Sequence, residues 1–332
     1  MASLIRPATP HDVPAIVALL SRGAQERGSL DPRLWRIAAD APARIEEAVG
    51  TVSTGSQASA RELWLVAEHA ARIVGVAHGM LVPVPPIYDS SAGSPGLLLD
   101  DCFVAGEAPS GTPEALLVAT ETALRTAGAS RLVASCPAAG PLRPLYERAG
   151  YAPVTLYMVK HHFSLHTLPS VVRPARAEDV PGLVKRSAEH RKTLAKINAR
   201  FWHIHPEADS RFGAWMHRSL TLKDRDMFVA AEAGEVHGYV IAQPMSPLLV
   251  PAGHKVAAIG VIDDFYDEDF ADISTLSGSG LSSEALLTAA ESAFARRAVD
   301  SALVVCPAAW SSKVSALQRR GYRTAKLWML RQ

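Results

Sequence analysis

The chain has 332 residues, a formal net charge of +1 and three cysteines. A near-neutral charge with no basic stripe argues against a nucleic-acid partner and against attraction to an anionic membrane surface. No apolar run reaches the roughly 18 residues of a membrane span, and the N-terminus lacks a charged-then-apolar leader, so we expect a cytoplasmic protein with reduced thiols.

The hydrophobic pattern of the first half predicts strands and helices in the order β-α-α-β-β-β-α-β-α-β. Strands are expected at 2–6, 63–67, 73–81, 97–104, 131–135 and 154–159, and helices at 10–20, 31–49, 114–126 and 142–149. Thr112 is a candidate N-cap for the third helix, and Pro113 suits its first position. This mixture predicts an α/β (α+β) fold, with a mixed, largely antiparallel sheet flanked by helices.

The second half of the chain repeats the first. Around Cys136 the sequence reads EALLVATETALRTAGASRLVASCPAA, and around Cys306 it reads EALLTAAESAFARRAVDSALVVCPAA, with no gap between the two. Other matches follow in the same order, which indicates two copies of one folding unit. We therefore predict a first unit over 1–160, a linker over 161–170 and a second unit over 171–332.

Two segments of the first copy carry a family resemblance. The chain opens with Ile5-Arg6-Pro7-Ala8, and the last helix ends with Leu145-Tyr146-Glu147-Arg148-Ala149-Gly150-Tyr151. These segments and the element order resemble the GNAT superfamily of acyl-CoA-dependent N-acyltransferases, in which tandem arrangements exist. The resemblance covers nearly the whole chain, twice. It implies transfer of an acyl group, most simply from acetyl-CoA to a small-molecule primary amine, by direct attack in a ternary complex.

The resemblance also implies a set of site residues in the first copy. Tyr146 would protonate the leaving thiolate, although a packed core tyrosine is the equal alternative. Asp100 or Asp101 would act as base or amine anchor, or would simply pair with a neighbouring arginine; because side chains alternate, only one of the two can face the acceptor cleft. The cofactor would be bound by Phe103 and Val104 and, at the pyrophosphate, by Ser110, Gly111 and Thr112 beside a helix N-terminus.

The two copies diverge at these places. Leu317 stands where the first copy has Tyr146, and the second loop follows an insertion of about seven residues that is rich in acids. The first loop contains Pro109 and Pro113, which have no N–H to donate. We therefore predict at most one working active site, in the first copy, and a degenerate second copy. The alternative is a tandem protein without activity that binds an acyl-CoA or another small ligand as a sensor or scaffold.

The remaining motifs are a pair of histidines and a proline-rich stretch. His203 and His205 would not share a helix face, so we expect no metal site. Tyr88 and Asp89 follow a proline-rich stretch and are candidate substrate contacts. Two copies in one chain already form a pseudo-dimer, so a monomer and a homodimer are both compatible with the sequence.

Overall fold

The computed structural model describes residues 2–53 and 62–332. The first half has the helices α1 (Val13–Leu30), α2 (Ala41–Ala48), α3 (Gly50–Ser53), α4 (Thr112–Thr126) and α5 (Arg143–Arg148). Its strands are β1 (Leu4–Pro7), β2 (Glu62–His69), β3 (Arg72–Leu81), β4 (Pro95–Leu98), β5 (Phe103–Val104), β6 (Arg131–Pro137) and β7 (Tyr151–His161). The second half has the helices α6 (Val180–Asn198), α7 (Ala208–Ser219), α8 (Leu281–Arg296) and α9 (Ser311–Arg319). Its strands are β8 (Val172–Pro174), β9 (Asp226–Glu232), β10 (Glu235–Pro244), β11 (Ile259–Asp267), β12 (Ser301–Pro307) and β13 (Arg323–Arg331).

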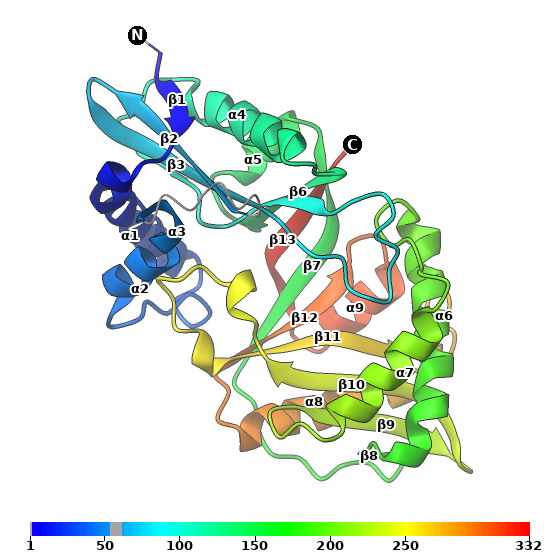
Figure 1. The fold of residues 1–332 in the computed structure, drawn as a ribbon. Helices are drawn as coiled ribbons and strands as arrows, with labels where there is room; N and C mark the ends of the chain where they lie inside the picture. The colour runs from blue at the N-terminus through cyan, green and yellow to red at the C-terminus, as the bar shows by residue number, and fades with distance from the viewer. Residues whose placement is uncertain (1, 54–61) are drawn as a thin grey trace.

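The strands of both halves join into one sheet. Their order is β1-β2-β3-β4-β6-β13-β7-β12-β11-β10-β9-β8, and β5 pairs with β3. The pairs β4–β6 and β11–β12 are parallel, and the other pairs are antiparallel. Helices α1 and α4 lie on opposite sides of β2 and β3 (Figure 1). The predicted mixed, largely antiparallel sheet flanked by helices is therefore confirmed.

The last strand of each half is exchanged between the halves. Strand β13, from the C-terminus, lies between β6 and β7 of the first half (Figure 1), with Leu327 opposite Cys136 on one side and Leu156 on the other. Strand β7 in turn pairs with β12 of the second half. Strand β13 therefore completes the sheet of the first half, and β7 completes the sheet of the second half. The exchange leaves no unpaired strand edge at the centre of the sheet.

Four local expectations differ from the structure. The helix expected over 10–20 begins at Val13 and continues to Leu30. The expected helix over 31–49 is shorter, because the Asp31 carboxylate accepts hydrogen bonds from the N–H groups of Arg33 and Leu34 and closes a turn instead. The expected strand over 97–104 is divided, and the chain bends between β4 and β5. The N-cap of α4 is Gly111, at a φ of +85°, so Thr112 is the first helical residue.

Helix α4 forms as the repeat predicted. Its buried positions Leu116, Leu117, Thr120 and Leu124 make one apolar stripe, which packs on β2 and β3. No helix among the described residues is long and apolar enough to cross a bilayer.

Candidate active site

A cavity of about 640 Å³ opens in the first half where β4 and β6 separate. These parallel strands are paired from Pro95 and Arg131 as far as Leu98 and Ala134. Beyond that point the chain leaves β6 and rejoins β3 as β5, which pairs Phe103 with Val76. Main-chain groups in such a gap have no neighbouring strand to bond, so they are available to a ligand.

The cavity runs from α1 to the start of α4. Gly23, Glu26 and Arg27 line one end, and the loop before α4 lines the other. Between them lie Asp100, Cys102, Phe103, Val104, Ser135 and Cys136. The predicted cofactor residues Phe103 and Val104 are thus part of its wall.

The predicted phosphate loop forms one end of the cavity, with Ser110 and Gly111 in the lining. Gly111 needs its left-handed φ for the chain to enter α4, which favours glycine. Within the described residues, the N–H groups of Ser110 and Gly111 have no hydrogen-bond partner. Thr112 lies behind the loop: it is buried, and its hydroxyl donates to the Pro109 carbonyl at 2.7 Å.

Arg148 was missed by the sequence reasoning as a site residue. It lines the same end of the cavity and lies 3.2 Å from Glu114 on α4. Its guanidinium is exposed, so it places a positive charge beside the loop. The available signal was its position in the Leu-Tyr-x-Arg segment that carries the family resemblance.

The carboxylates of Asp100 and Asp101 face different surroundings, as predicted, but both lie in the bend between β4 and β5 and not on a strand. Asp100 is buried and lines the cavity, and its Oδ2 lies 2.6 Å from the Lys326 ammonium. That ammonium also donates a hydrogen bond to the Leu249 carbonyl at 2.6 Å. The buried Ser135 hydroxyl has no hydrogen-bond partner among the described residues. An ion-paired carboxylate and an unpartnered hydroxyl therefore line the middle of the cavity.

Asp101 belongs to a separate polar group behind the cavity. Its Oδ2 lies 3.5 Å from His78 Nδ1, and His78 Nε2 lies 2.8 Å from Glu62. Burial disfavours the charged form of both groups, but their mutual attraction outweighs it, so the pKa of Asp101 falls below its usual range. The pKa of His78 rises, because both carboxylates favour the imidazolium over the cost of its burial.

Tyr146 lies one layer further in. Its side chain is buried and lines a small adjoining cavity of about 20 Å³ that shares Cys102, Phe103 and Leu145 with the large one. Its hydroxyl makes no hydrogen bond to the described residues. Burial raises the pKa of Tyr146 well above its usual value, with the nearby Cys102 and Cys136 adding to the shift. The group therefore keeps its proton at neutral pH.

The second half supplies part of this site. Lys326 comes from the exchanged strand β13. The Arg27 guanidinium donates to the Asp100 carbonyl at 2.5 Å and contacts the His254 ring nitrogen at 3.2 Å. No local sequence signal links Lys326 or His254 to Asp100, because both contacts depend on how the two halves pack.

The matching cleft of the second half is filled by its own side chains. Lys313 is buried there, and its ammonium donates to the Phe265 carbonyl at 2.5 Å, among the rings of Phe265 and Trp310. The Trp310 indole donates to the Phe270 carbonyl at 3.1 Å, which fixes the acidic insertion over the strand. A pantetheine chain would have to displace this group.

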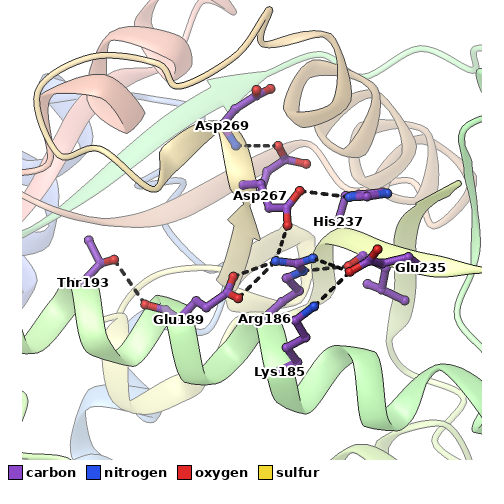
Figure 2. Close-up of polar contacts among 10 residues, drawn as sticks. Lys185, Arg186, Glu189, Thr193, Glu235, His237, Asp267 and Asp269 are labelled. Carbon is purple, nitrogen blue, oxygen red and sulfur yellow. Dashed lines mark hydrogen bonds and ion pairs between the residues drawn. The ribbon is translucent and has the colours of Figure 1, made fainter.

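The anion position of the second half holds carboxylates. Asp267, at the end of β11, accepts the Ser282 hydroxyl at 2.7 Å in the first turn of α8 and accepts the Asp269 N–H at 3.0 Å. Figure 2 shows Asp267 and Asp269 beside the network around Arg186, which contacts Glu189 and Glu235. A helix N-terminus that already receives a carboxylate is a poor site for a pyrophosphate.

The fold of the chain is shared with solved structures. The chain has the fold of the GCN5-related N-acetyltransferases in its tandem form. It resembles a GCN5-related N-acetyltransferase from Sphaerobacter thermophilus, with a TM-score of 0.57 and 16% identity over 99% of this chain and 95% of the other. It also resembles a tandem GNAT protein from the clavulanic acid biosynthesis pathway, with a TM-score of 0.52 and 14% identity over 99% and 97%.

A third structure contains the same fold within a longer chain. This is a fungal multi-domain GH3 beta-N-acetylglucosaminidase with a GCN5-related glucosamine N-acetyltransferase region, at a TM-score of 0.54 and 12% identity. The match covers 99% of this chain and 38% of that one. No family model and no curated protein matches the sequence.

Proposed function

We propose that the protein is an acyl-CoA-dependent N-acyltransferase, most simply an acetyltransferase, that works in the cavity of its first half. The observation that carries this proposal is the course of the cavity: it begins at a loop with free N–H groups, follows the gap between β4 and β6, and reaches a buried carboxylate. A phosphate-bearing thioester needs the first two features, and a cationic acceptor needs the third.

Residues of the loop, the mouth and the wall of the cavity would each bind one part of the cofactor. Ser110 and Gly111 bind the pyrophosphate through their N–H groups, and Arg148 adds charge at the mouth. The main chain of Phe103 and Val104 aligns the pantetheine arm. Thr112, which is turned away from the cavity, supports the loop through its bond to Pro109.

Acyl transfer would be direct. Asp100 attracts the protonated acceptor and takes up one proton from it, directly or through water, which leaves a neutral amine. The amine nitrogen attacks the thioester carbonyl, the C–N bond forms and the C–S bond breaks. The nitrogen loses its second proton to water, while Tyr146 gives a proton to the thiolate and regains one from solvent. Asp101 faces away from the cavity, and we assign it to the positioning of His78.

Binding of acetyl-CoA by the full-length protein tests this proposal. At a concentration of 100 times its dissociation constant, a ligand that binds the folded state alone stabilises it by about 2.7 kcal/mol. We expect a clear rise in Tm with acetyl-CoA, measured by differential scanning fluorimetry, and none with the free acyl anion as control. No shift at millimolar acetyl-CoA would contradict the proposal.

The second candidate is a tandem protein that binds an acyl-CoA without transferring the acyl group. Pro109 and Pro113 favour it, since they reduce the number of N–H donors in the loop. Both candidates predict the rise in Tm. Only the enzyme releases free thiol when acetyl-CoA is mixed with a panel of primary amines, so a thiol assay separates the two.

A further inference from the structure

A second cavity, of about 360 Å³, lies where the two halves meet. Its walls come from both: from the loop after β3 and from β7 of the first half, and from α6, α7, β11, β12 and β13 of the second. It shares no lining residue with the first cavity. Six aromatic side chains line it: Tyr88, Tyr157, Phe201, Trp202, Trp215 and Trp328.

Two carboxylates on β11 lie in the same cavity. The Asp264 carboxylate already has partners within the protein. It accepts a hydrogen bond from the Tyr239 hydroxyl at 2.7 Å and lies 3.2 Å from His190 Nδ1. Asp263 is open to the cavity, and its Oδ2 accepts the side-chain amide of Gln243 at 2.8 Å.

The other charged groups of the lining have partners. Arg191 pairs with Asp209 and bonds the Ser187 hydroxyl, and Asp89 lies 3.3 Å from His203. The Arg131 guanidinium donates to the main-chain carbonyls of residues 200 and 201. Among the described residues that line the cavity, Asp263 is the carboxylate without a cationic partner.

We propose that this cavity is a second small-molecule site, which binds an organic cation with an apolar body. The ammonium would pair with Asp263, and the aromatic walls would cover the body and attract the positive charge through their ring faces. The cofactor cleft behind β11 is filled by Lys313 and Trp310, so a ligand bound here receives no acyl group at this position. This second site therefore binds its ligand without a chemical reaction.

Titration of the full-length protein with phenethylamine tests this site. Trp202, Trp215 and Trp328 line the cavity, so tryptophan fluorescence reports occupancy directly, and calorimetry gives the stoichiometry. We expect one phenethylamine per chain at this site, and binding at least tenfold weaker for 3-phenylpropionate, which has a similar body and the opposite charge. Equal affinity for the two probes would overturn the proposal.

Two matched variants assign the binding to this cavity. Asp263→Asn should weaken phenethylamine binding at least tenfold, whereas Asp100→Asn, in the first cavity, should leave the fluorescence titration unchanged. Saturating acetyl-CoA should also leave it unchanged, so the result is independent of whether the first cavity is an active site. The reverse pattern, with loss in Asp100→Asn alone, would overturn the proposal.

A third variant, Trp215→Leu, tests the site even if Asp263→Asn does not fold. It removes part of the aromatic wall and leaves the carboxylates in place. We expect a several-fold loss of affinity for phenethylamine with the Tm of the free protein above the assay temperature. An unchanged affinity would show that the amine binds elsewhere.

Discussion

At the residue scale, Tyr146 shows how a buried side chain can fit two roles. Its packing against Tyr151, at 5.6 Å between ring centroids, is that of a core residue. Its hydroxyl has no hydrogen-bond partner among the described residues and lies in the small cavity that Cys102 also lines, as a proton donor to a thiolate would. Burial raises the pKa of Tyr146, which keeps its proton at neutral pH but makes the hydroxyl a weaker acid. The sequence left both roles open, and burial alone does not separate them.

Tyr146→Phe tests the proton-donor role. We expect turnover to fall by about a hundredfold or more, the usual contribution of a general acid, while the dissociation constant of acetyl-CoA stays unchanged. Tyr151→Phe is the matched control, since it removes a buried hydroxyl that donates to Glu121 at 2.8 Å outside the cavity. Similar turnover in the two variants would remove Tyr146 from the mechanism.

The carboxylate of Asp31 should make the free energy of unfolding depend on pH in the acid range. Burial would raise its pKa, but the hydrogen bond from His161, the Leu34 N–H and the charge of Arg323 outweigh burial and lower it from 3.8 to about 2. A lowered pKa stabilises the fold above pH 3.8, and that stabilisation is lost as pH falls from 3.8 through 2. Asp31→Asn should therefore lower the free energy of unfolding at pH 7 by about 1–2 kcal/mol, after allowance for solvent screening.

Chemical denaturation between pH 7 and pH 2 measures this effect. The difference between Asp31→Asn and the unaltered protein should shrink toward zero at the acid end. Asp40→Asn, at an exposed pair with Arg44, is the control and should change little. A difference that stays constant down to pH 2 would show that the effect of Asp31 is not electrostatic.

At the element scale, the entry into α4 decides how the first cavity ends. The chain reaches the helix through Gly111 at positive φ, and Ser110 and Gly111, whose main-chain N–H groups have no partner among the described residues, line the cavity. The sequence predicted the helix and its loop but placed the cap one residue late. A propensity argument favours threonine at the N-cap, and only the backbone geometry shows that a left-handed residue is needed there.

Gly111→Ala should therefore affect both stability and ligand binding. Alanine at this φ costs about 1–2 kcal/mol, and relief of the strain would move the loop and weaken acetyl-CoA binding several-fold. Gly128→Ala is the matched control, because Gly128 has a φ of +98° at the far end of the same helix, outside the cavity. Calorimetry at equal temperature compares them; equal affinity in both variants would contradict the assignment of the loop.

At the scale of the whole molecule, the exchange of β7 and β13 makes the two halves interdependent. Leu327 of β13 packs in the core of the first half with Leu98, Leu117 and Tyr146, and lies opposite Cys136 in the cavity wall. The second half thus supports the cavity of the first half, although β13 is far from the other wall residues in the sequence. This dependence gives a reason why a copy with a filled cleft is retained as part of the fold.

Leu327→Ala tests this dependence. The change should destabilise the protein by about 2–5 kcal/mol and should also weaken acetyl-CoA binding, since it opens space behind β6. Leu287→Ala, equally buried on α8 in the second half, should destabilise by a similar amount without changing the affinity. If both variants bind acetyl-CoA like the unaltered protein, β13 has no part in the site.

The sequence by itself determined the repeat, the order of the elements and the divergence of the copies at the phosphate loop and at Tyr146. These features are local, because hydrophobic periodicity and turn residues act within a few positions of the chain. The tertiary structure decided which strands pair across the halves, and hence that Lys326 meets Asp100 and that Tyr88 and Asp89 line the cavity between the halves. It also decided that Lys313 and Trp310 fill the cleft within the second half. Strand pairing between distant segments depends on the packing of the whole chain, and no short-range pattern encodes it.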